Sequence, residues 1–164
     1  MKPIGRRILS GLLLGLLSLP AYSGTRIESL YVPGPNLELE GRWLSPYARA
    51  SSDPAQASLF VAESAFKEML LTIPPAFIGK NVRIFLIIPP QTPGIAGPAG
   101  LEVQWRTQGV FLPGTARPGE RVLFFQGVIQ QSPLRDLIAY TFRVDARYNS
   151  GQIRFDPIYE IEER

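Results

Sequence analysis

Short stretches in which apolar and polar residues alternate recur through most of the chain. In residues 101–106, leucine, valine and tryptophan alternate with glutamate, glutamine and arginine. A period of two is typical of a strand with one buried and one solvent-facing side. The strands predicted from these stretches are Ile27–Val32, Leu37–Trp43, Val82–Ile88, Leu101–Trp105, Val110–Leu112, Arg121–Ile129, Leu137–Arg147 and Gln152–Ile161. Sixteen prolines and fifteen glycines separate them, and such punctuation predicts a mostly β fold, an antiparallel two-sheet sandwich of about seven to nine strands.

One predicted strand differs from the others because Ile84–Ile88 is apolar on both faces. Fully apolar strands are usually buried, so we expect a central strand that is covered on both sides. The alternative is that this strand and the Pro-rich segment 89–100 contribute to an interaction surface.

Residues 54–71 allow two interpretations. Asp53 as N-cap, Pro54 as first residue and Gln56 two positions later are typical of a helix start, and a mainly apolar face then recurs at helical spacing. We favour one short helix over about residues 54–71. The alternative is two strands, Ser58–Ala62 and Phe66–Thr72, because apolar residues interrupt the polar face of the helix.

Two hairpins are predicted in the second half of the chain. For the C-terminal one, a connection at Tyr148–Gly151 sets Val144 opposite Phe155 on one face and Asp145 opposite Arg154 on the other. A slip by one residue would place the apolar side chains on the wrong face. The other hairpin is expected across residues 113–119, where Pro118-Gly119 suits a type II turn.

The N-terminal residues have the features of a cleavable secretory signal. Lys2, Arg6 and Arg7 precede a short apolar run, and small residues stand before a boundary between Ser23 and Gly24. The run has roughly a dozen apolar residues, whereas a membrane span needs about 20. We therefore predict a signal peptide at 1–23, a single β-sandwich domain at 24–164, no stable transmembrane segment after cleavage, and a periplasmic or extracellular location.

Removal of the leader changes the charge of the chain. The full sequence has 17 Lys+Arg and 14 Asp+Glu, and residues 1–23 contain three basic and no acidic residues, which leaves 17 − 3 = 14 basic against 14 acidic residues. A nucleic-acid partner requires a basic surface that displaces counterions, so a nucleic-acid partner is not expected. The chain has no cysteine, which fits a domain large enough to fold without disulfides.

The residue types available for chemistry are few. The chain has no histidine and no cysteine, which excludes catalytic triads, thiolate nucleophiles and the usual zinc and haem ligands. No phosphate-binding, dinucleotide-binding or calcium-binding motif is present, so no cofactor and no metal are expected. A glycan hydrolase based on two carboxylates is the remaining enzymatic alternative. Its candidate acids are Glu102, Asp136, Asp145 and Asp156.

Aromatic residues are the best candidates for ligand binding. Trp43, Tyr47 and Tyr148 could line an exposed surface that stacks on sugar rings, whereas Trp105 shares a strand face with leucine and valine and is expected in the core. The prediction that leads is an exported, non-enzymatic interaction or structural module of the cell envelope with a protein partner. A carbohydrate-binding module is the alternative.

Overall fold

The structure, a computed structural model, describes residues 24–32, 39–43 and 59–164. The predicted leader and Tyr47 lie outside the described residues. The described chain is mostly strand with almost no helix. Its strands are β1 (Thr25–Val32), β2 (Leu39–Trp43), β3 (Leu59–Ser64), β4 (Lys67–Thr72), β5 (Asn81–Ile87), β6 (Leu101–Thr107), β7 (Gly114–Ala116), β8 (Arg121–Val128), β9 (Leu134–Asp145) and β10 (Ile158–Glu163). Three short 3₁₀ turns lie between them: η2 (Pro75–Phe77), η3 (Pro98–Gly100) and η4 (Ala146–Tyr148).

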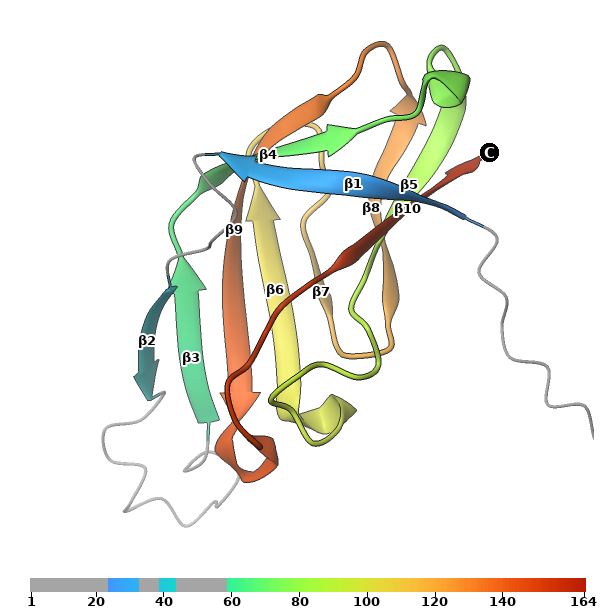
Figure 1. The fold of residues 1–164 in the computed structure, drawn as a ribbon. Coiled ribbons are helices and arrows are strands. Elements are labelled where there is room, and N and C mark those ends of the chain that lie inside the picture. Colours follow the sequence, from blue (N-terminus) through green and yellow to red (C-terminus); the bar gives the residue numbers. More distant parts are fainter. Residues whose placement is uncertain (1–23, 33–38, 44–58) are drawn as a thin grey trace, which may run out of the picture.

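All of these strands belong to one antiparallel sheet that is nearly barrel-shaped (Figure 1). The hydrogen-bonded order is β2-β3-β9-β4-β1-β10-β5-β8, and β6 joins β9 to β7. Strand β8 ends this order and β7 ends the branch through β6, and the two come close to each other. The backbone N–H of Leu112, just before β7, donates to the carbonyl of Phe124 in β8 at 2.7 Å. The expected division into two sheets is not confirmed, because the ladders run from strand to strand around the fold.

The long strand β9 organises half of this sheet. One of its sides pairs with β6, and the other pairs with β3 near residues 141–145 and with β4 near residues 134–138. Glu63 of β3 is opposite Thr141, and Lys67 of β4 is opposite Ile138. Between these two pairs, the chain through β3 and β4 advances four residues, whereas β9 advances three. Strands β3 and β4 therefore line the same side of β9 one after the other, and a β-bulge of one extra residue lies between Ser64 and Lys67.

The helix predicted over about 54–71 is wrong for residues 59–71, and the alternative of two strands is confirmed there. Residues 54–58 lie outside the described residues. The error has a physical cause in the bulge. Ala62 and Met69 both face the core, and the extra residue between them separates them by seven positions, which is also two turns of a helix.

The inside of the sheet is filled with side chains. Trp105, Tyr140, Tyr159 and Phe124 have at most 1% of their surface exposed and pack in one core with aliphatic residues from nearly every strand. The predicted core position of Trp105 is confirmed, and its indole N–H donates to the carbonyl of Leu112 at 2.8 Å. Strand β5 lies between β10 and β8, which confirms the predicted central position. Val82, Ile84, Leu86 and Ile87 are buried, whereas Phe85 on the other face is half-buried, so the predicted cover on both sides is not confirmed.

The predicted C-terminal hairpin is wrong. Strand β9 pairs with β3, β4 and β6, whereas β10 pairs with β1 and β5. Residues 152–157 are not strand, and in Figure 1 they cross β9. The ring of Phe155 packs edge-on against that of Phe142, with the ring centroids 5.0 Å apart. The charges that suggested the register pair within their own segments, Asp145 with Arg147 and Arg154 with Asp156. Long-range apolar pairing therefore prevails over local charge complementarity.

The turn at Pro118-Gly119 is confirmed, although the strands around it do not pair with each other. The N–H of Glu120 donates to the carbonyl of Arg117 at 3.0 Å and Gly119 has a φ of +92°, as a type II turn requires. However, β7 pairs with β6 and β8 pairs with β5. The strand predicted at Val110–Leu112 is also wrong, because these residues form a loop before β7.

Candidate functional site

The seam between β1 and β10 closes at one end and opens at the other. Thr25, Arg26 and Ile27 pair with residues 161–159 of β10. From Glu28 onward, β1 pairs with β4 instead, and the chain before Ile158 is not strand. In Figure 1 the blue β1 and the red β10 cross, and the red segment that leads into β10 runs away from β1. The sheet therefore has a gap in its wall at this seam.

A groove of about 540 Å³ lies at this gap and is open to solvent. We call it the β1–β10 groove. It is lined by Arg26, Ile27, Glu28, Ser29, Pro157, Ile158 and Tyr159. In an antiparallel strand, alternate backbone N–H and C=O groups point to opposite sides. Residues 28–32 use one side for β4, and among the described strands none pairs with their other side. The groove therefore offers backbone donors and acceptors of an open strand edge.

The hydroxyl groups of three tyrosines, one each from β1, β9 and β10, lie together beneath this gap and connect these strands. The Tyr140 hydroxyl of β9 lies 2.9 Å from that of Tyr31 in β1 and 3.1 Å from that of Tyr159 in β10. The Tyr159 hydroxyl also donates to the sulfur of Met69 at 3.9 Å. Burial raises the pKa of Tyr140 and of Tyr159 well above the ordinary value for tyrosine, and it also raises the pKa of Tyr31. These side-chain hydrogen bonds join β1 to β10 where the ladder between them is missing.

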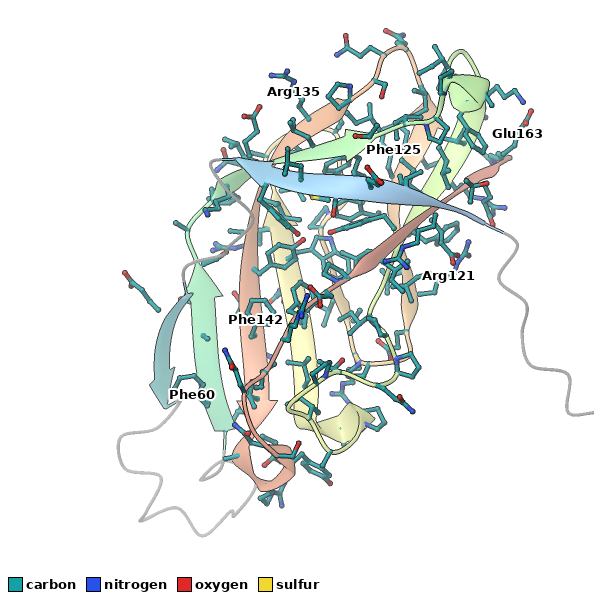
Figure 2. The ribbon with its side chains drawn as sticks, in the orientation of Figure 1. Phe60, Arg121, Phe125, Arg135, Phe142 and Glu163 are labelled. Carbon is teal, nitrogen blue, oxygen red and sulfur yellow. The ribbon has the colours of Figure 1, made fainter. Side chains whose placement is uncertain are left out.

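The closed end of the seam is held on its outer face by charged side chains of β5, β8 and β10. Arg121 of β8 is labelled in Figure 2. It donates to Glu162 at 2.9 Å, and its guanidinium lies 3.4 Å from the centroid of the Phe85 ring. Arg83 pairs with the other oxygen of Glu162 at 2.7 Å. Partial burial strengthens such cation–π and ion-pair contacts. Strand β10 is thus fixed at its C-terminal end, whereas its N-terminal end borders the groove.

The three residues predicted to bind a ligand are placed only in part. The backbone of Trp43 pairs with that of Phe60 in β3, and Phe60 pairs in turn with Val144. The C-terminal ends of β2 and β9 therefore lie at the same level of the sheet, with β3 between them. Tyr148 follows β9 in η4 and is half-buried. A Cβ on Gly100 would come within 2.4 Å of the Tyr148 Cβ, which shows how closely η3 covers this residue. Tyr47 lies outside the described residues, and the convergence of the three aromatics stays a prediction.

The candidate acids of a hydrolase all have other partners. Asp136 is buried and accepts the backbone N–H groups of Gln108 at 3.2 Å and Phe111 at 2.7 Å. Glu102 pairs with Arg117 and Arg143 at 2.9 and 3.2 Å, and Asp145 and Asp156 pair as given above. None of the four lines the β1–β10 groove. In the described part of the chain, no three acidic side chains gather in a way that could hold a metal ion.

The groove was not found by reading the sequence. It depends on which strands pair with the two ends of the described domain, and Ser29 and Pro157 are 128 positions apart in the chain. The one local signal was Pro157, which cannot donate to a ladder and therefore favours an edge or a break there.

Comparisons with known proteins give no assignment. No protein-family model matches the chain, and neither a curated protein nor a solved structure matches it significantly. Among the described residues, no helix is long and apolar enough to cross a membrane. The fold and the site thus define the class only, an antiparallel, nearly barrel-shaped β domain with an open strand edge.

Proposed function

We propose that this protein is an exported, non-enzymatic interaction module that binds an extended segment of a protein partner in the β1–β10 groove. The partner segment adds a strand to β1, a recognition mode in which main-chain hydrogen bonds give affinity and side-chain pockets give specificity. The leader at 1–23 directs the chain to the periplasm or the extracellular space, so the partner is another component of the envelope or its surroundings.

The open edge of β1 is the observation that carries this proposal. Five residues, Glu28–Val32, have a ladder with β4 on one side only, and at about 3.3 Å per residue they extend over about 17 Å. A segment of similar length in a partner can use the free side. Sheet edges that are left exposed are natural templates for added strands, and here the edge borders a groove instead of a flat surface.

The side chains around the groove suit a peptide whose residues alternate between apolar and polar. Ile27 and Tyr159 are buried beneath the groove, Ile158 is half-buried, and Arg26 and Glu28 are exposed at its rim. In an added strand, one set of side chains would face Ile158 and the other would face solvent and the two rim charges. Because the rim carries one basic and one acidic residue, it favours a particular register of the bound peptide more than a particular net charge of that peptide.

A cross-linking experiment tests the site. Because the chain has no cysteine, Ser29→Cys places a single thiol in the groove for a photoactivatable label. Gln104→Cys is the matched control, since Gln104 is exposed on β6 and does not line the groove. In the native envelope, we expect a discrete adduct from the Ser29→Cys protein and none from the Gln104→Cys protein. Equal labelling from both positions would contradict the proposal.

A second measurement separates a peptide from a glycan. The partner segment found in the adduct is synthesised and added to the isotope-labelled protein. An added strand slows hydrogen exchange at alternate amides of Glu28–Val32, because those N–H groups gain hydrogen-bond acceptors. A glycan bound near Trp43 and Tyr148 leaves these amides unchanged and alters tryptophan fluorescence instead. Unchanged exchange in β1 with the synthetic segment bound would exclude strand addition.

A further inference from the structure

We infer that removal of the leader creates a structural ion pair, in which the new α-ammonium group of Gly24 binds the carboxylate of Glu160. This inference rests on the export part of the proposed function and is independent of the partner. Hydrolysis of the Ser23–Gly24 peptide bond consumes one water. The C–N bond breaks, and the hydroxyl of the water joins the Ser23 carbonyl carbon. The nitrogen of Gly24 takes the other proton of the water and the proton that the new Ser23 carboxyl group releases, and so becomes an ammonium group. A processing endopeptidase of the export route catalyses the step.

The position of Gly24 over Glu160 carries the inference. A Cβ on Gly24 would lie 2.9 Å from the Glu160 Cβ and 3.0 Å from its Oε2. Since the bonds N–Cα and Cα–Cβ are about 1.5 Å each, the Gly24 nitrogen lies within about 6 Å of that oxygen. An opposite charge at this distance stabilises a carboxylate. A bulkier residue at position 24 would collide with Glu160, so glycine fits here for a steric reason.

One carboxylate oxygen of Glu160 lacks a hydrogen-bond donor. Its Oε2 atom is buried and accepts no hydrogen bond from the described residues, although it lies 3.4 Å from Nε of Arg121. By contrast, neighbouring Glu162 accepts from Arg121 and pairs with Arg83. A buried carboxylate oxygen without a donor costs free energy. An α-ammonium group brings three N–H donors, whereas the peptide N–H of an uncleaved chain brings one and no charge.

The register places this contact at the closed end of the seam. Arg26 is opposite Glu160 and Thr25 is opposite Ile161, so Gly24 is the residue that continues β1 along β10. The pair would fasten the first residue of the mature chain to its last strand. Processing then stabilises the end of β1 opposite the groove, while residues 28–32 keep their open edge.

The first test is the mass of the exported product. The full chain is expressed in a bacterial host and recovered from outside the cytoplasm. The expected mass is that of residues 24–164. A product that keeps the leader, or one that begins elsewhere, overturns the inference, whereas cross-linking at Ser29 still tests the groove on its own.

The second test compares the 24–164 chain with a 23–164 chain, in which the ammonium group is one residue farther from Glu160. At pH 6 we expect an unfolding equilibrium constant about fivefold smaller for the 24–164 chain, measured with urea. Glu160→Gln should abolish the difference between the two chains. Glu163→Gln is the control, because Glu163 pairs with Lys80 on the exposed surface, and it should leave the difference intact. Equal stability of the two chains with Glu160 present overturns the inference.

The pH dependence gives a readout that does not depend on a variant. Pairing with Glu160 raises the pKa of the Gly24 α-ammonium above its ordinary value of about 7.7–8.0. The other charged groups on this face are Arg26, Arg83, Arg121, Glu160 and Glu162. The extra stability is therefore complete below about pH 7.7 and is lost as the pH rises through the raised value. Acylation of the α-amine should show the same raised pKa, and an ordinary value there contradicts the ion pair.

Discussion

Raising the pH above 10 should destabilise the fold through the tyrosine cluster beneath the groove. Tyr140 and Tyr159 each have 1% of their surface exposed, and burial raises the pKa of both well above the ordinary 10.0. Below pH 10 the folded and unfolded chains both keep these protons, so stability does not depend on them. Above pH 10 the unfolded chain loses them and the folded chain does not, and stability falls.

The size of the effect follows from the number of raised groups. Each contributes a loss of about 1.4 kcal/mol per pH unit above the unfolded value. The two most buried tyrosines together give about 2.7 kcal/mol per pH unit, or about 4 kcal/mol between pH 10 and 11.5. Domains of this size have roughly 5–15 kcal/mol of stability, so we expect alkaline unfolding to begin within this range.

Tyr140→Phe isolates the contribution of the cluster. At neutral pH the variant loses a hydroxyl that contacts both Tyr31 and Tyr159, at a cost of about 1–2 kcal/mol. Above pH 10 its loss of stability per pH unit should be about half to two thirds of that of the parent, because the pKa of Tyr31 is raised as well. Tyr148→Phe is the control at neutral pH, where a change within about 0.5 kcal/mol is expected. Urea unfolding at a series of pH values measures both terms, and equal alkaline slopes for the parent and Tyr140→Phe would refute the reasoning.

Two further predictions concern loops that border the sheet. Asp136→Ala removes the acceptor of the Phe111 N–H and one of the two acceptors of the Gln108 N–H, which also donates to the Leu137 carbonyl. The substitution should cost about 1–3 kcal/mol, with faster proteolysis in residues 108–111; an unchanged melting temperature would contradict the role given to Asp136. Gly100→Ala places a Cβ within 2.4 Å of the Tyr148 Cβ and should cost about 1–3 kcal/mol in urea unfolding, whereas a neutral result would mean that η4 moves freely away from η3.

Local patterns in the sequence identified most of the strands but not their partners. Alternation located β6, whose buried residues alternate with half-buried or exposed ones, and a run of apolar residues located β5. The predicted strands Ile27–Val32 and Arg121–Ile129 also overlap β1 and β8. Alternation failed around Ala65 because a bulge adds one residue and shifts the pattern. The C-terminal hairpin failed for a different reason, since two strands that follow each other in the chain each found partners more than 70 positions away.

The candidate site could not be predicted from the sequence for the same reason. Pairing of β1 with β10 and then with β4 determines where the wall opens, and neither ladder is local. The hydroxyls of Tyr31, Tyr140 and Tyr159 meet only because these strands do. By contrast, the exclusion of histidine and cysteine chemistry needed no geometry, because the chain contains neither residue.

Hydrogen exchange at the amides of β1 in the free protein tests the open edge most directly. Residues 28–32 should show alternate protection, slow at amides that bond to β4 and fast at those that face the groove, whereas β5, which is paired on both sides, should be slow throughout. Uniform slow exchange along Glu28–Val32 would mean that another segment already occupies this edge in solution, and strand addition by a partner at β1 would then be excluded.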